Sequence, residues 1–149
     1  MILRDVVLAW FHFVCIFTLV GTLVCEVVLY RQEMDASRLA LLRRVDIGFG
    51  ISAGLVIVSG VLRVIFGLKG AAFYLDNPIF WTKMGLFLAI GLLSIPPTVH
   101  YLRIGGTGGT VVIPDQAYRR TWTLLLVEVG LLACIPFFAT LLAHGYNRL

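Results

Sequence analysis

Ionisable side chains interrupt the long apolar runs of this sequence, and their depths define two layers. A charge at the centre of a bilayer costs about 2.5–3.5 kcal/mol, so each such residue marks a candidate site. A helix rises about 1.5 Å per residue, which allows depths to be compared between segments. One layer is cationic and contains His12, Arg63 and Lys83; the other is mainly acidic and contains Glu26, Asp46, His100 and Glu128.

The cationic layer is a candidate anion site. Arg63 and Lys83 have no acidic residue of the apolar segments at their depth, and Asp76 in a short loop is the nearest candidate partner. The two side chains either extend to the membrane surface along their apolar stems or hold the carboxylates of a ligand between helices. Aromatic residues at this depth form either an interfacial belt or part of that site: Trp10, Phe11, Phe80 and Trp81.

A histidine in the first segment is the central residue of this layer. One face of that segment is more polar than the rest and carries, within an arc of about 80°, His12, Cys15, Leu19, Thr22 and Glu26. We expect this face to point into a helix bundle, where His12 is either a hydrogen-bonded structural residue or a haem ligand. His144 is level with His12 and is a candidate second metal ligand if Pro136 rotates the end of its helix.

The acidic layer allows two interpretations. Glu26, Asp46 and Glu128 lie near the arginine-rich loops, and salt bridges to those arginines account for them. Alternatively, carboxylates within a membrane can relay protons, and Glu128 is then a candidate proton acceptor.

Composition identifies the environment that these residues occupy. Hydrophobic residues make up 60% of the 149 residues and charged residues 13%, which excludes a water-soluble or disordered chain. Backbone groups in hydrocarbon must bond within their own segment, and about 20 residues cross the bilayer as a helix. The sequence therefore predicts an all-α integral membrane protein, an antiparallel four-helix transmembrane bundle in one domain over residues 1–149, with helices over 6–30, 45–68, 79–101 and 121–144.

Basic residues predict the orientation of the bundle. Seven arginines lie in or beside the loops 31–44 and 103–120, and three basic residues lie on the opposite side. The positive-inside rule then predicts a bacterial inner-membrane protein with both termini outside the cytoplasm. Its surroundings are lipid, and the short, scattered basic groups indicate no nucleic-acid partner. The three cysteines have no metal-binding spacing.

Local patterns add three expectations. Pro96 and Pro97 should kink the third helix. The glycine-rich residues 105–110 should form a flexible linker, since no phosphate-binding pattern accompanies them. Small residues of the second helix, including Gly50 and Gly54, allow close helix packing and can support a homo-oligomer.

Two stretches of sequence resemble a known family. Phe80-Trp81-x-Lys83-Met84-Gly85-Leu86-Phe87 and Gly91-Leu92-Leu93-Ser94-Ile95-Pro96-Pro97-Thr98 are similar to domain of unknown function 2214, a bacterial family of small membrane proteins. Glu128, Ile135-Pro136 and Ala143-His144-Gly145 extend the resemblance to the fourth helix.

A more distant resemblance is to the four-helix membrane protoporphyrinogen IX oxidases. It rests on His12 early in the first helix, Lys83 at the start of the third and Glu128 in the fourth. The resemblance implies porphyrin or haem binding, with His12 as iron ligand and Lys83 near the site. The sequence departs from that family in Val129-Gly130, which follows Glu128 where the family has proline, and in Thr82 before the lysine.

Three functions follow from these patterns. In the first, the bundle binds b-type haem or a porphyrin through His12, Arg63, Lys83 and Trp81, and Glu128 accepts or relays protons in electron transfer or porphyrinogen oxidation. In the second, a small transporter or its accessory subunit binds an anion through Arg63 and Lys83. In the third, the chain is a structural subunit without its own ligand.

Overall fold

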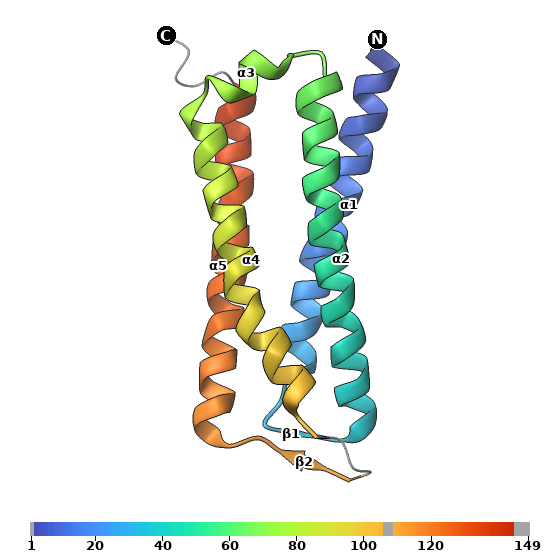
Figure 1. The fold of residues 1–149 in the computed structure, drawn as a ribbon, viewed down its shortest axis with the longest axis vertical. Coiled ribbons are helices and arrows are strands. Elements are labelled where there is room, and N and C mark those ends of the chain that lie inside the picture. The colour runs from blue at the N-terminus through green and yellow to red at the C-terminus, as the bar shows by residue number, and fades with distance from the viewer. Residues whose placement is uncertain (1, 106–108, 145–149) are drawn as a thin grey trace.

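Four long helices run up and down in an antiparallel bundle (Figure 1). The computed structural model describes residues 2–105 and 109–144. Each long helix is apolar enough to cross a membrane, so the predicted all-α membrane bundle is confirmed. Their bounds are α1 Ile2–Leu29, α2 Ala36–Phe66, α4 Pro78–Arg103 and α5 Asp115–Ala143.

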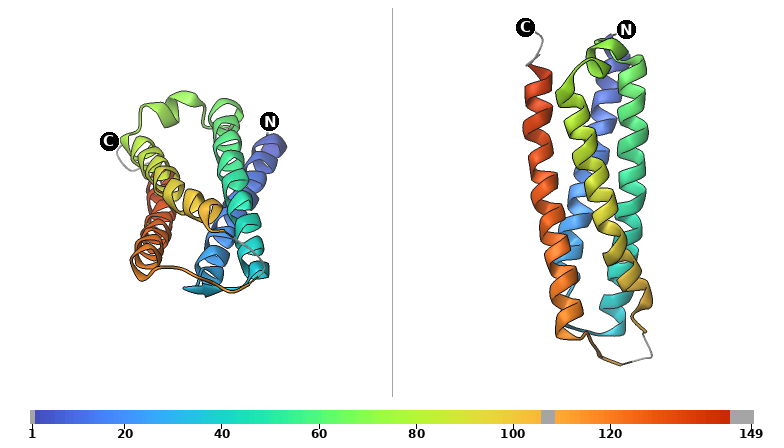
Figure 2. Two further views of the ribbon diagram at one scale, coloured as in Figure 1. Left: turned by 60° about the horizontal axis from the view of Figure 1, so that its bottom comes forward. Right: turned by 60° about the vertical axis from the view of Figure 1, so that its left-hand side comes forward.

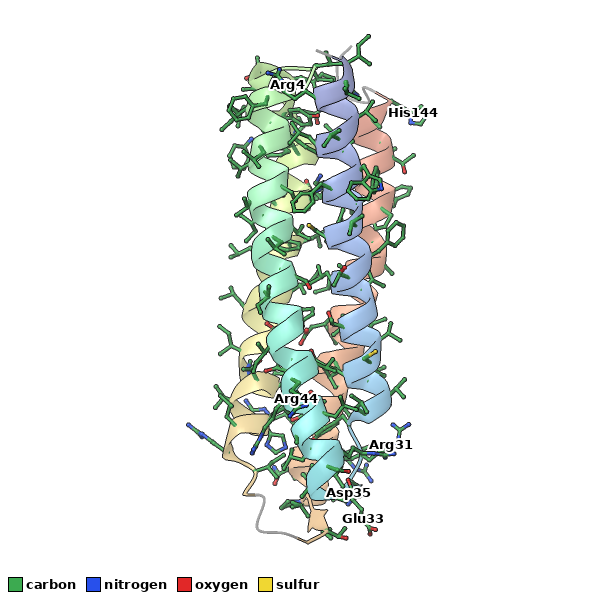
Figure 3. The ribbon with its side chains drawn as sticks, turned by 90° about the vertical axis from the view of Figure 1, so that its right-hand side faces the viewer. Arg4, Arg31, Glu33, Asp35, Arg44 and His144 are labelled. Atoms are coloured by element: carbon green, nitrogen blue, oxygen red, sulfur yellow. The ribbon has the colours of Figure 1, made fainter. Side chains whose placement is uncertain are left out.

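The bundle has two chemically different ends. We call the end where α1 begins and α5 ends the terminal end, and the opposite end the strand end (Figure 1). Figure 3 shows Arg4 and His144 at the terminal end, and Arg31, Glu33 and Asp35 at the strand end. Mostly apolar side chains cover the helices between them, as expected for surfaces that face lipid.

All four long helices begin earlier than the sequence predicted, by one residue for α4 and four for α1, and two of them begin more than a turn earlier. α2 starts at Ala36 rather than residue 45, and α5 starts at Asp115 rather than residue 121. Arginines and other polar residues are mixed into these turns and lower their hydropathy below that of the spanning segments. Asp35 caps α2 by accepting a hydrogen bond from the Arg38 backbone N–H at 2.7 Å. That bond and the Ser37 hydroxyl lower the pKa of Asp35 below its ordinary value.

The loops at the strand end are tied together. β1 (Glu33–Met34) and β2 (Val111–Val112) pair antiparallel, with Glu33 opposite Val112. Of the predicted linker, residues 106–108 lie outside the described residues, but the chain that follows is an ordered strand. Met34 and Ile113 are buried beneath this pair and close the core.

The interior face of α1 is the predicted one. Its buried residues are His12, Cys15, Leu19, Leu23 and Glu26. α1 packs mainly along α2, and α4 mainly along α5, so the bundle consists of two helical hairpins (Figure 2). A side chain at Gly48 would contact Thr22, and one at Gly60 would contact the His12 ring. Gly50 and Gly54 instead face away from other helices.

The end of α4 leans across the bundle toward α2 (Figure 1). The helix continues through Pro96 and Pro97, whose missing N–H groups loosen it locally. Beyond them, Thr98 donates a 2.7 Å hydrogen bond to Asp46, and Arg43 donates to the carbonyl oxygens of Tyr101 and Ile104. These contacts join the two hairpins at the strand end.

A short helix completes the terminal end. α3 (Ala71–Leu75), which the sequence did not predict, lies between α2 and α4. The indole Nε1 of Trp81 donates a 2.9 Å hydrogen bond to the Leu75 carbonyl oxygen. Asn77 caps the start of α4 by accepting from the Ile79 N–H at 2.9 Å.

Candidate functional site

A histidine and a serine meet inside the bundle near the terminal end. His12 of α1 is 9% exposed, and its Nδ1 lies 2.7 Å from the Oγ of buried Ser59 on α2. Ser59 also donates its hydroxyl proton to the Leu55 carbonyl oxygen at 2.7 Å. A serine hydroxyl has one proton, so its oxygen accepts the bond from His12. His12 therefore carries a proton on Nδ1.

The second ring nitrogen of His12 has a different environment. Within the described part of the chain, no hydrogen bond satisfies Nε2. A neutral imidazole protonated on Nδ1 presents a lone pair on Nε2, which is the form that binds a metal. The contact with Gly60 allows the ring to lie directly against the α2 backbone.

Two cations share this layer with His12. Arg63 follows Ser59 by one turn of α2, and Lys83 comes from α4; their charges act on His12 and on each other. Among the described residues neither one forms an ion pair, and Asp76 is not a partner. The Arg63 Nε is buried and has no hydrogen-bond acceptor. We call His12, Ser59, Arg63 and Lys83 the cationic site.

Two predicted members lie outside the cationic site. Trp81 is 57% exposed and bonds to α3, so it belongs to the surface of the bundle. His144 is exposed at the end of α5 and bonds to the Thr140 carbonyl oxygen of its own helix at 2.9 Å (Figure 3). The structure does not bring either residue into the interior where His12 lies.

The acidic residues form a second interior cluster nearer the strand end. Glu26 comes from α1, Asp46 from α2 and Glu128 from α5, and each carboxyl group is close enough to affect another electrostatically. Glu26 is 2% exposed and Glu128 1%, and one oxygen of each has no hydrogen-bond partner in the described residues. We call these three residues the acidic cluster.

The predicted salt bridges to the acidic cluster are wrong for the described residues. The ion pair found there joins Arg119 to Asp115, on the surface of α5. Arg43 precedes Asp46 of the cluster by three residues, but it donates its hydrogen bonds to carbonyl oxygens at the end of α4. Carbonyls at a helix C-terminus lack partners within the helix and attract cations.

The two sites are separated along the bundle axis. His12 and Glu26 are fourteen residues apart on α1, which corresponds to about 21 Å at 1.5 Å per residue. Glu128 is near enough to Glu26 to act on it electrostatically, so it belongs to the same end of the bundle. It is therefore too distant to accept a proton directly from a molecule bound at His12.

Ser59 and Tyr101 are site residues that the sequence analysis did not identify. Ser59 precedes Arg63 by four residues, which puts both on one face of α2. Tyr101 follows the two prolines and is fully buried near the acidic cluster. The spacing of Ser59 from Arg63 could have indicated its role. It becomes informative only once the structure shows that α1 brings His12 against that face of α2.

Comparisons with known proteins bear on the family of this chain. No curated protein and no solved structure matches it, so the similarity to porphyrinogen oxidases stays a sequence-based prediction. The family model for the predicted membrane proteins DUF2214 matches residues 4–147. This match covers almost the whole sequence, and the chain therefore belongs to the DUF2214 family of predicted membrane proteins.

Proposed function

We propose that this membrane protein binds an anionic tetrapyrrole, b-type haem or a porphyrin, at the cationic site. One observation carries the proposal. The charges of Arg63 and Lys83 both act on the buried His12, and among the described residues neither cation has an acidic partner. An anion at this position would neutralise both charges.

The charges favour a ligand with carboxylates. Arg63 lies in the last turn of α2 and Lys83 near the start of α4, and two positive charges that act on each other repel. Haem and protoporphyrin each carry two propionate groups, which match two cations. The buried Arg63 Nε lacks an acceptor and would gain one. A charge-assisted hydrogen bond of this kind is stronger than a neutral one.

The histidine distinguishes haem from other anions. His12 would bind iron through Nε2, while Ser59 holds Nδ1 and fixes the orientation of the ring. Iron bound in this way supplies one-electron redox chemistry. The residues of this chain would hold the ligand, with Arg63 and Lys83 on its carboxylates and Ser59 fixing the tautomer of His12.

A second candidate function uses the same cations without iron. The unpaired charges of Arg63 and Lys83 equally favour a phosphate or carboxylate from a lipid headgroup or a small solute. In a small transporter or accessory subunit, His12 would then be a structural residue. The two functions differ in their dependence on His12.

Titration with two ligands separates these functions. The purified protein is titrated with haemin and, separately, with protoporphyrin IX, and binding is followed by absorption and fluorescence quenching. We expect Arg63→Ala and Lys83→Ala to weaken both ligands, and His12→Ala to weaken haemin alone. His144→Ala is the matched control, because it removes an exposed histidine at the same end.

Each outcome of the titration has a defined meaning. If none of the three cationic-site variants changes the affinity for either ligand, the proposed tetrapyrrole site is wrong. The small-anion function would be favoured if haemin and protoporphyrin do not bind, and if Arg63→Ala and Lys83→Ala each weaken the binding of inorganic phosphate.

We also infer an orientation in which the terminal end faces away from the cytoplasm. The arginines at the strand end support this inference, because cytoplasmic flanks are enriched in basic residues. Reporter fusions to the two loops at the strand end test it. If a reporter that is active only in the periplasm is active when fused to those loops, the orientation is opposite to the one inferred.

A further inference from the structure

The acidic cluster and the neighbouring Tyr101 together involve all four long helices. Besides Glu26, Asp46 and Glu128, Tyr101 of α4 is near enough for its phenol to interact electrostatically with all three carboxyl groups. Thr98 of α4 donates to one oxygen of Asp46 at 2.7 Å. In the described part of the chain, no lysine or arginine forms an ion pair with any of the carboxyl groups.

The hydroxyl of Tyr101 is an unused polar group beside this cluster. Tyr101 is 0% exposed, and its oxygen has no hydrogen-bond partner of ordinary geometry within the described residues. It nevertheless lies near enough to Glu26 to interact with that carboxyl group. A phenol beside carboxyl groups can donate its proton to whichever of them is ionised, so the pair adjusts when a proton binds or leaves.

A pocket lies next to the cluster at the strand end. It has a volume of about 470 Å³ and opens between α4 and α5, where His100, Arg103, Arg120 and Thr121 line it. A volume of this size holds several water molecules, because each occupies about 30 Å³ in the liquid. Water can therefore reach His100.

Tyr30 connects this pocket to the interior. Its hydroxyl lies 3.2 Å from the His100 Nε2 and also faces Thr121. Its ring packs against Tyr101, with ring centroids 5.6 Å apart. Tyr30, at the end of α1, is fully buried, and it contacts both His100, which lines the pocket, and Tyr101 beside the acidic cluster.

We propose that Glu26, Asp46 and Glu128 form a buried proton-binding site that exchanges protons with the strand-end pocket through His100 and Tyr30. A proton from pocket water binds a carboxylate oxygen, which neutralises one negative charge of the cluster. It leaves by the same route. The proposal does not depend on a tetrapyrrole at the cationic site.

A proton fits this cluster better than a metal ion. Among the described residues, no three histidine, cysteine or acidic side chains are arranged to hold a metal. Three carboxylates in a low-dielectric interior repel one another strongly if all are ionised. One bound proton removes one of these negative charges and relieves this repulsion.

Infrared spectroscopy tests the proton site on the full-length protein in lipid vesicles. A protonated carboxyl group has a C=O band distinct from that of a carboxylate, and the band shifts when the proton is exchanged for deuterium. At neutral pH we expect such a band in the native protein, and its loss or displacement in Glu26→Gln and Glu128→Gln. Glu33→Gln is the matched control, since Glu33 is exposed on β1.

The exchange rate tests the route through the pocket. A positioned side chain accelerates proton transfer by about 10²–10⁴-fold, so His100→Ala should slow deuterium exchange of that band by at least about tenfold. His144→Ala should leave the rate unchanged. A purely structural role for His100 would alter stability without a selective effect on this rate.

Three results would overturn the proposal. They are the absence of a protonated carboxyl band at neutral pH, a band unchanged in both glutamine variants, and a band abolished by sodium or calcium ions at constant pH. Glutamine is close to glutamate in size, and helical content by circular dichroism identifies folded variants. If one variant fails to fold, the other, together with Asp46→Asn, decides the question.

Discussion

Replacing Ser59 with alanine removes the hydrogen-bond acceptor of the His12 Nδ1. The bond is 2.7 Å long and buried, and it joins α1 to α2. Side-chain hydrogen bonds between membrane helices contribute about 0.6 kcal/mol on average and about 1.7 at most. An unsatisfied buried donor costs about 1–3 kcal/mol. We therefore expect Ser59→Ala to lower the free energy of unfolding by about 1–2 kcal/mol.

Ser52 provides a matched control for this substitution. It is a buried serine on the same helix and donates to the Gly48 carbonyl oxygen four residues back, as Ser59 does to Leu55. Ser52 has no side-chain partner on α1 within the described residues. The difference between Ser59→Ala and Ser52→Ala therefore isolates the contact with His12.

Two assays measure this difference. Unfolding in mixed detergent micelles gives the free energy, and titration with haemin gives the affinity. Loss of a group that orients a metal-bound histidine typically weakens metal binding by about 10–100-fold. We expect haemin affinity to fall within that range in Ser59→Ala and to stay near its native value in Ser52→Ala. Equal behaviour of the two variants in both assays would refute the proposed role of Ser59.

Three further predictions concern the elements around the sites. Thr98→Val removes the hydrogen bond to Asp46 and should lower the free energy of unfolding in micelles by about 0.6–1.7 kcal/mol; an unchanged value would contradict the contact. The lowered pKa of Asp35 means that its cap stabilises the fold above the ordinary aspartate pKa and is lost as pH falls through the lowered one. Asp35→Asn should remove this acid dependence in unfolding measured against pH. Trp81→Phe loses the bond to the Leu75 carbonyl oxygen but should leave haemin affinity unchanged, since the indole lies on the surface.

Much of the fold follows from hydropathy and helical period. The apolar runs predicted the four long helices, and the polar face containing His12 predicted the interior side of α1. The start of α2 was missed because residues 36–44 extend beyond the apolar segment. The β1–β2 pair was missed because two-residue strands have no periodicity to detect.

The sites were predictable in depth but not in direction. Depth alone brought His12, Arg63 and Lys83 into one layer, and the structure agrees for these three. Trp81 precedes Lys83 by two residues, which is about 200° around a helix, so the two side chains point to opposite sides. His144 failed for the same reason, because level residues do not necessarily face the same interior.

The acidic cluster illustrates a second limit of sequence analysis. Arginines near Glu26 and Glu128 in depth suggested ion pairs, but the chain offers other acceptors. The carbonyl oxygens at the end of α4, beyond Pro96 and Pro97, accept hydrogen bonds from Arg43. Competition between a carboxylate and a helix end depends on the packing of α4 against α2, which no local pattern contains.

The absorption spectrum of the purified protein tests the central claim most directly. The protein is produced in haem-supplied cells, purified in detergent, and measured before and after reduction with dithionite, beside His12→Ala. Our account predicts a Soret band with sharpened α and β bands on reduction in the native protein, and their loss in a folded His12→Ala variant. A colourless native protein that also fails to bind added haemin would contradict it.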